Sequence, residues 1–153
     1  MVLLEQQYVW TPKDTAHDVP FAFVCPPEIA SIRISFSFSP GMEQQDAICM
    51  PQIEAALTRY YDCYPRDIQP MDAQQFLPIK NLITLSLERE GVYLGNAHRW
   101  APEQEHIITT EQASRGFVPP VAMEGSWTGM LHLHEIISPR CVGQLRMEGS
   151  VQI

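Results

Sequence analysis

Residues 31–38 read Ser-Ile-Arg-Ile-Ser-Phe-Ser-Phe, and this stretch decides the fold class. Every second residue is apolar, and the residues between them are serine or arginine. A β-strand points successive side chains to opposite faces of its sheet, whereas a helix repeats every 3.6 residues. The alternation therefore predicts a strand with one face in a hydrophobic core and the other toward water.

The same alternation recurs in residues 82–88 and, at the carboxyl end, in residues 141–148. Weaker strand patterns cover residues 4–10, 21–24, 92–95, 106–110 and 128–137, and 13 prolines and eight glycines separate the segments. About eight short strands at near-regular spacing are typical of a β-sandwich or a barrel. We predict an all-β, antiparallel, jelly-roll-like β-sandwich formed by residues 1–153 as a single domain.

One segment, residues 51–64, breaks the strand pattern. Its apolar residues recur at the spacing of an amphipathic helix: Ile53, Ala56, Leu57, Tyr60 and Tyr64. Pro51 suits the first helical position and Pro65 ends the helix. Residues 41–75 carry six acidic and two basic side chains, half of the net charge of −8. We expect an acidic helix inserted between two strands, as a lid, a contact surface or a solvated cover over one end of the core.

Composition and charge exclude several classes of protein. A chain of 153 residues with 45% hydrophobic residues can bury its own core without disulfide or metal support. A net charge of −8 disfavours a nucleic-acid partner. No apolar run approaches the 18 residues of a membrane span, and residues 1–7 lack the pattern of a signal peptide. Four cysteines without a Cys-x-x-Cys pair predict reduced, mostly buried thiols, so we expect a cytoplasmic protein.

The sharpest local motif is Leu131-His132-Leu133-His134-Glu135. Alternation along a strand places the two imidazoles on one face, about 6.5–7 Å apart, close enough to share a metal ion. The same face should carry Met130 and Ile136. Zinc or iron needs at least one further ligand, for which the candidates are His98, His106, Glu135 and Cys141. The alternative is that one histidine is partly buried and hydrogen-bonded while the other faces solvent.

Several known site motifs fail in this chain. Cupins carry G-x5-H-x-H with a glutamate three or four residues later and then a further histidine. Here Glu135 follows at once, Gly125 is one residue too far upstream, and no histidine follows His134. There is no G-x-S-x-G nucleophile motif and no glycine-rich phosphate loop. A Cys/His pair that meets only in the folded chain stays open.

Aromatic residues offer another kind of site, because an exposed ring can stack on a sugar. We take Trp100 and its neighbour Arg99 as candidate ligand-binding residues. Trp127, which follows Gly125 at the start of a strand, is expected in the core.

Four segments of the second half follow a familiar order: Leu85-Ser86-Leu87, then residues 91–99 (Gly-Val-Tyr-Leu-Gly-Asn-Ala-His-Arg), then Arg115-Gly116-Phe117-Val118-Pro119, then Glu124-Gly125-Ser126-Trp127. This order resembles the amino-terminal β-sandwich of bacterial PHP-type (polymerase and histidinol phosphatase) metal-dependent phosphoesterases. In that family the metals are held in a following α/β domain, so the resemblance transfers no catalytic residue. It implies a free-standing accessory sandwich, although Pro120 stands where the family has glycine.

Together these patterns predict a non-catalytic accessory module. It would bind a partner protein or a small polar ligand such as a glycan, and neither nucleic acid nor membrane. A metal-dependent enzyme built on His132 and His134, with His98 as third ligand, is the first alternative, and a divalent metal is the one cofactor that the sequence suggests. The second alternative is a homo-oligomeric structural protein that pairs through edge strands or the acidic helix.

Overall fold

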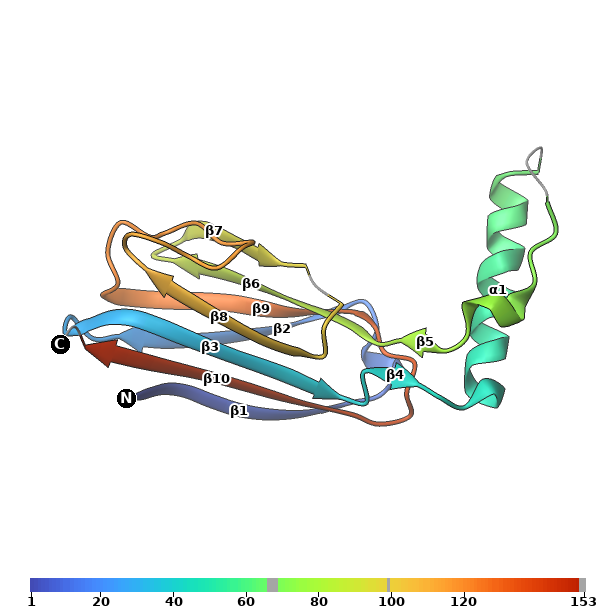
Figure 1. Cartoon of the computed structure of the whole chain (residues 1–153), viewed down its shortest axis with the longest axis horizontal. Helices are drawn as coiled ribbons and strands as arrows, with labels where there is room; N and C mark the ends of the chain where they lie inside the picture. Colours follow the sequence, from blue (N-terminus) through green and yellow to red (C-terminus); the bar gives the residue numbers. More distant parts are fainter. Residues whose placement is uncertain (66–68, 99, 152–153) are drawn as a thin grey trace.

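The computed structural model describes residues 1–65, 69–98 and 100–151, and it confirms the all-β sandwich. Two four-stranded antiparallel sheets pack face to face, and one helix stands at the end of the sandwich (Figure 1). The first sheet has the order β1 (Val2–Trp10), β10 (Cys141–Val151), β3 (Ile29–Ser39) and β8 (Glu103–Thr109). The second sheet has the order β2 (His17–Cys25), β9 (Gly125–Glu135), β6 (Leu82–Arg89) and β7 (Val92–Ala97).

The strand pairing is nested. β1 pairs with β10, β2 with β9, β3 with β8, and β6 with β7, all antiparallel. β10 also pairs with β3, and β9 with β6, which completes the two sheets. A chain folded back on itself in this way, with eight strands divided between two sheets, has the topology of a jelly roll.

The core lies between the two sheets and follows the predicted alternation. From β3, Ile32, Ile34 and Phe36 are at most 1% exposed, whereas the residues between them face outward. Trp127 is fully buried in β9, as predicted, where its ring stacks on Phe23 with centroids 5.8 Å apart. The indole N–H of Trp127 is also satisfied, because Nε1 donates a hydrogen bond of 2.8 Å to the backbone carbonyl oxygen of Met123.

Two strands in the second sheet differ from the prediction. β2 begins at His17 rather than at residue 21, and Pro20 lies inside it. This is possible because β2 is an edge strand, where the missing N–H of proline costs no ladder bond. β9 ends at Glu135 instead of residue 137. The alternation stops there, so Ile136 turns into the core and does not share the histidine face.

The helical insertion joins β3 to β6, as expected. It contains β4 (Met42–Glu43), α1 (Asp46–Cys63), the 3₁₀ helix η2 (Ala73–Phe76) and β5 (Ile79–Lys80). A second 3₁₀ turn, η1 (Pro12–Asp14), connects β1 to β2. None of the described helices is long and apolar enough to cross a membrane.

The predicted start of the helix was wrong, because α1 begins five residues before Pro51. A proline inside a helix loses one hydrogen bond, and here burial of the preceding turn offsets that loss. Cys49 is fully buried, and its thiol donates to the backbone oxygen of Glu43. The Glu43 side chain also accepts a hydrogen bond of 2.9 Å from the N–H of Gln45, the residue that caps the helix.

The buried residues of α1 lie in its first half. Cys49 and Ile53 form a small apolar cluster with Ile137, separate from the main core. Farther along the same helix face, Tyr60 and Tyr64 are 43% and 54% exposed. Figure 1 shows the helix rising away from the end of the sandwich rather than lying over either sheet. The predicted amphipathic face therefore exists, but the sandwich covers only part of it.

The glycines that carry the family resemblance have a structural role. Gly95 in β7 has φ +134° and forms an isolated bridge with Phe117. A Cβ at Gly95 would clash with the carbonyl oxygen of Gly116, so only glycine allows the two segments to meet. The N–H of Asn96 donates to that oxygen over 3.0 Å. Gly95 and Gly116 thus allow the segment around Phe117 to lie directly against the edge strand β7.

Candidate functional site

The three histidines predicted as a ligand set do gather on the outer face of the second sheet. β9 places His132 and His134 on one face because they are two residues apart, and their ring centroids are 6.1 Å apart. His98 follows β7, and its ring meets that of His134 edge to face at 5.4 Å. The structure therefore brings together three imidazoles from two separate segments of the chain.

His132 is held at both ring nitrogens. Nδ1 lies 2.7 Å from Oδ1 of Asp18, its partner across the β2–β9 pairing, and Nε2 lies 2.8 Å from Oγ of Ser86 in β6. An ionised carboxylate can only accept, so Nδ1 carries a proton, and in the neutral imidazole Nε2 accepts the hydrogen bond from the Ser86 hydroxyl. Asp18, His132 and Ser86 therefore form one hydrogen-bonded row across three strands.

His134 makes a simpler contact, with Nε2 2.9 Å from Oγ1 of Thr84 in β6. Burial lowers the pKa of His134 below its ordinary value, and the neighbouring imidazoles of His98 and His132 lower it further, while Asp18 opposes the shift. The neutral form of His134 is therefore favoured in the folded protein.

No group of three or more His, Cys, Asp and Glu side chains among the described residues is arranged to hold a metal ion. A metal ion on His132 would have to displace Asp18 or Ser86. Of the other ligand candidates, His106 is buried in β8 of the opposite sheet and Cys141 lies in the core. The metal site on His98, His132 and His134 stays a prediction.

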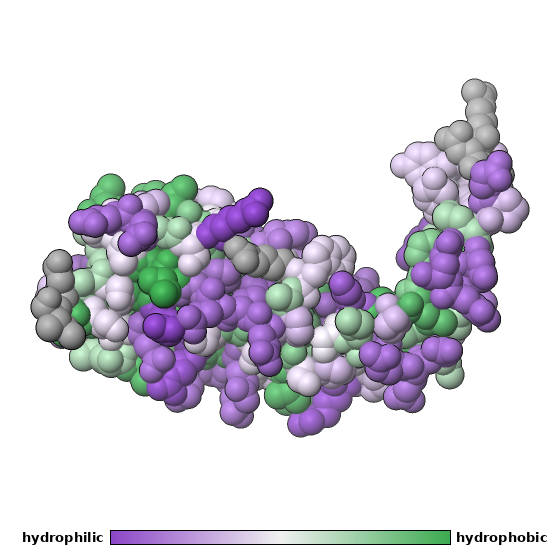
Figure 2. Space-filling view, viewed as in Figure 1, coloured by the Kyte–Doolittle hydropathy of each residue, from purple (hydrophilic) through white to green (hydrophobic). Residues whose placement is uncertain are grey.

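A large apolar cleft of about 800 Å³ opens between α1 and the end of the sandwich. Figure 2 shows the lobe formed by α1 rising from the sandwich so that a notch separates the two. Side chains of α1, η2 and β5 line the cleft together with the start of β6, and the apolar ones are Ile53, Ala56, Leu57, Tyr60, Met71, Phe76, Pro78, Ile79, Leu82, Trp100 and Ile137. This volume is within the range of about 300–1,000 Å³ that is usual for ligand sites.

Two cations and one acid border this cleft: Arg59, Lys80 and Glu135. The Lys80 amine lies 5.6 Å from the centre of the Trp100 ring, a cation–π geometry. Within residues 1–65, 69–98 and 100–151, no carboxylate forms an ion pair with Arg59 or Lys80. Trp100, a predicted ligand-binding residue, is 57% exposed here, whereas Arg99 lies outside the described residues.

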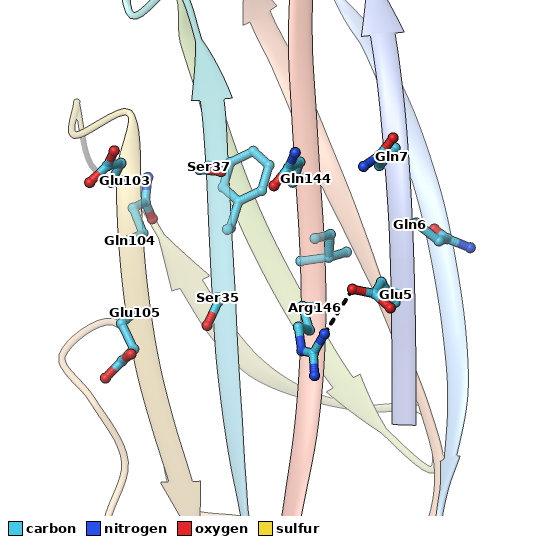
Figure 3. Close-up of a pocket in the computed structure, with 12 residues that line it drawn as sticks. Glu5, Gln6, Gln7, Ser35, Ser37, Glu103, Gln104, Glu105, Gln144 and Arg146 are labelled. Atoms are coloured by element: carbon cyan, nitrogen blue, oxygen red, sulfur yellow. Dashed lines mark hydrogen bonds and ion pairs between the residues drawn. The ribbon is translucent and has the colours of Figure 1, made fainter. Parts of the chain in front are cut away.

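The outer face of the first sheet forms a shallow polar hollow of about 470 Å³ (Figure 3). The pairing register aligns Gln7, Gln144, Ser37 and Glu103 in one row across the four strands, and Glu5, Arg146, Ser35 and Glu105 in the next. Arg146 donates to Glu5 and to Glu148, each over 2.8 Å. Among the described residues, no hydrogen bond is made by the side chains of Gln7, Ser35, Ser37, Glu103 and Gln144.

With this geometry established, the chain can be compared with known proteins. No protein-family model and no curated protein matches the sequence. The side chains themselves therefore carry the functional inference.

Sequence reasoning missed the partners of the histidines and the cations of the cleft. Ser86 and Thr84 were visible as polar positions of a predicted strand, but their partners depend on which strand lies beside it. Asp18 lies before the predicted strand 21–24, and nothing in the sequence around it indicated that it contacts a histidine. Lys80 lies just before a predicted strand, and Arg59 was counted only as a charge on the helix.

Proposed function

We propose that the protein is an accessory binding module that holds a segment of a partner protein in the cleft beneath α1. The segment would combine apolar side chains with a carboxylate. The observation that carries this proposal is a half-covered amphipathic helix facing an open apolar cleft. The resemblance to the sandwich modules of PHP-type phosphoesterases supports an accessory role.

Apolar surface favours a peptide over a small polar ligand in this cleft. Tyr60, Phe76 and Trp100 are each between 43% and 57% exposed, although aromatic side chains gain most from burial. Exposed aromatic residues that gather in one hollow are typical of protein-binding surfaces and of their energetic centres. Their exposure in the free protein leaves binding energy available to a partner.

Charge selects the kind of peptide. The whole chain has a net charge of −8, yet Arg59 and Lys80 bring to the cleft two cations that form no ion pair with a carboxylate of the described residues, and Glu135 is the one acid among its described lining residues. A carboxylate on the incoming segment would meet these cations, and their field would steer acidic segments toward the cleft. An apolar segment with a net negative charge therefore fits better than a basic one.

Trp100 provides a direct assay. The other two tryptophans, Trp10 and Trp127, are at most 4% exposed, so a ligand in the cleft should change the fluorescence of Trp100 alone. We would select binders from a library of random twelve-residue peptides and titrate the best of them while following tryptophan emission. The expected binders are apolar and acidic, and they shift the emission of the wild type but not of a Trp100→Phe variant.

A pair of double variants provides the control for charge. Arg59→Glu with Lys80→Glu should weaken an acidic peptide at least tenfold, because two attractive contacts become repulsive. Lys13→Glu with Arg140→Glu changes the net charge equally at exposed cations away from the cleft, and binding should persist. Equal losses in both variants, or a library that yields only basic peptides, would contradict the proposal. Dimerisation that blocks peptide binding would identify a second copy of the chain as the occupant.

The hollow on the first sheet supports a second candidate, a small polar ligand such as a glycan. Five of its amide, hydroxyl and carboxylate side chains make no hydrogen bond within the described part of the chain, and they can donate and accept side by side across four strands. A glycan array probed with the wild type and with a Ser37→Ala/Gln144→Ala variant tests it. Binding to one saccharide class that is lost in the variant supports the site, and an array without hits refutes it.

A further inference from the structure

The row of Asp18, His132 and Ser86 has the order of groups that activates a serine for attack on a carbonyl carbon. We propose that Ser86 is a nucleophile that accepts acyl groups from small, uncharged esters, with His132 as its general base and Asp18 as a positioning residue. This inference is independent of the cleft beneath α1, because the row lies on the outer face of the second sheet, in β2, β9 and β6.

The hydrogen bonds define the direction of proton transfer. The Asp18 carboxylate accepts from Nδ1 of His132 over 2.7 Å, which leaves the lone pair of Nε2 directed at the Ser86 hydroxyl 2.8 Å away. Both distances are in the range expected for a nucleophile bonded to its base and a base bonded to its orienting group. The nearest other imidazole is that of His134 on the same strand, and the ring of His98 contacts His134 rather than His132.

Space for a substrate adjoins the nucleophile. Ser86 lies at the border of a hollow of about 540 Å³ on the same sheet face, with Pro20, Ala22, Thr128 and Met130 as neighbours. The pairing register puts Pro20, Met130 and Ser86 in one row, so an apolar acyl group can lie beside the Ser86 hydroxyl. Glu88 also lines the hollow, and its carboxylate disfavours anionic esters.

The reaction balances without a cofactor. The Ser86 oxygen bonds to the ester carbonyl carbon while the hydroxyl proton moves to Nε2 of His132, and the electron pair of the carbonyl π bond moves onto the carbonyl oxygen until the leaving group departs. The bond from that carbon to the alcohol oxygen then breaks, and the departing oxygen takes the proton from Nε2. Water then hydrolyses the acyl-serine: its oxygen bonds to the acyl carbon while one of its protons moves to Nε2 of His132. The bond from that carbon to the Ser86 oxygen breaks, and the Ser86 oxygen takes the proton back from Nε2.

Turnover should be slow after acylation. Ser86 belongs to β6, which is paired on both sides with β7 and β9, so the backbone N–H groups around it are committed to the ladders. Acyl-transfer enzymes usually stabilise the carbonyl oxygen with free N–H groups, and losing one such donor costs about 10²–10³ in rate. This loss slows acylation and deacylation alike, but an ester with a good leaving group such as p-nitrophenolate acylates Ser86 faster than the resulting serine ester is hydrolysed. We therefore expect a burst of one acyl group per chain followed by little steady turnover.

The neighbouring pair Thr84 and His134 provides an internal control. It repeats the hydroxyl–imidazole contact one step along the same strands, at 2.9 Å. In the part of the chain that the structure describes, no carboxylate pairs with His134, whereas Asp18 pairs with His132. If the carboxylate and not the imidazole alone activates the hydroxyl, Ser86 should react and Thr84 should not.

The test uses p-nitrophenyl acetate and the intact chain at pH 7.5. Release of p-nitrophenolate is followed through the burst, and peptide mass mapping locates the acetyl group, which we expect on Ser86. Ser86→Ala should abolish the burst, and His132→Gln should slow it about 100-fold or more. Asp18→Asn should slow it about fivefold, since Asp18 is exposed, and Asp18→Glu should recover part of the rate.

The control variant Thr84→Val should keep the burst of the wild type, and thermal melts should show that each variant is folded. Acetyl groups found only on lysines or the amino terminus would overturn the proposal, and mapping of the wild type decides this even if a variant fails to fold. An unchanged burst in folded Ser86→Ala or His132→Gln, or equal rates for Asp18→Asn and Asp18→Glu, would overturn the assigned roles.

Discussion

Replacing Asn81 by alanine should destabilise the protein more than any other single loss of hydrogen bonds described above. Asn81 is fully buried immediately before β6. Its Nδ2 donates to the backbone oxygen of Pro40 and to Oγ of Ser138, both over 2.8 Å. Its Oδ1 accepts from the N–H groups of Ile137 at 2.7 Å and Ser138 at 3.3 Å. One side chain thus joins the end of β3, the start of β6 and the turn after β9.

The size of the effect follows from the groups that alanine would leave unpaired. The N–H of Ile137 and the polar atoms of Ser138 would lose a partner in a buried site, whereas the part-buried carbonyl of Pro40 keeps a weak contact with the Cys141 thiol. A buried group without a partner costs about 1–3 kcal/mol, and some of these groups will reach water after local relaxation. We expect a loss of about 3–4 kcal/mol, which for a domain of this size lowers Tm by about 6–16 °C.

Urea unfolding followed by tryptophan fluorescence measures this loss, and Asn96→Ala is the matched control. Asn96 is the other asparagine of the chain, and its buried Oδ1 has no hydrogen-bond partner among the described residues. Removing an oxygen that has no partner should cost about 1 kcal/mol or less. If both variants lose the same stability, or if Asn81→Ala loses less than about 1 kcal/mol, the hydrogen-bond network does not have the assigned role.

Three further predictions concern other regions. Gly95→Ala should lower the free energy of unfolding, measured in urea, by about 3 kcal/mol. The new methyl group would clash with a backbone oxygen, and φ at this position is positive. An unchanged free energy of unfolding would contradict this. Burial and the neighbouring imidazoles lower the pKa of His134, so its contribution to stability is complete above pH ~6.5 and is lost as the pH falls toward that lowered pKa. His134→Gln should flatten this part of the Tm–pH curve, and a parallel curve would refute the assignment. A thiol reagent at pH 7.5 should modify Cys63 in the native protein, because Cys63 is exposed. Cys25 and Cys141 should react far more slowly, because burial raises the pKa of each thiol to about 11. Mass spectrometry counts the labels, and equal labelling of the three cysteines would refute the prediction.

The sequence was informative wherever one strand or helix sufficed to determine the pattern. The alternation of residues 31–38 predicted the buried face of β3, and the spacing of residues 53–64 predicted the apolar face of α1. The helix was wrongly predicted to begin at Pro51, because the sequence does not show that Cys49 is buried and that this burial stabilises an additional turn before the proline. The wrong position of Ile136 has a similar cause, since the strand ends where the chain turns toward Asn81.

Contacts between strands were harder to predict. Two histidines on one face of β9 follow from their spacing, but the partners of His132 depend on β2 and β6 flanking β9. A period of two says nothing about which strands are neighbours, and the nested order of this fold joins segments far apart in sequence. For the same reason the apolar cleft could not be expected, because it arises where α1 leaves the sandwich.

The nested pairing also has a consequence for how the chain folds. β1 can complete its ladder only with β10, and β2 only with β9, so within this sandwich the earlier strands pair with the later ones. Folds dominated by such distant pairings form in about milliseconds to seconds, and until then the strand edges stay open to intermolecular pairing. β6 and β7 are adjacent in sequence and can pair early. β1, β2 and β3 stay unpaired until the ribosome has synthesised their partners β10, β9 and β8. We expect yield during expression to depend more on synthesis temperature and chaperone supply than on the stability of the finished sandwich.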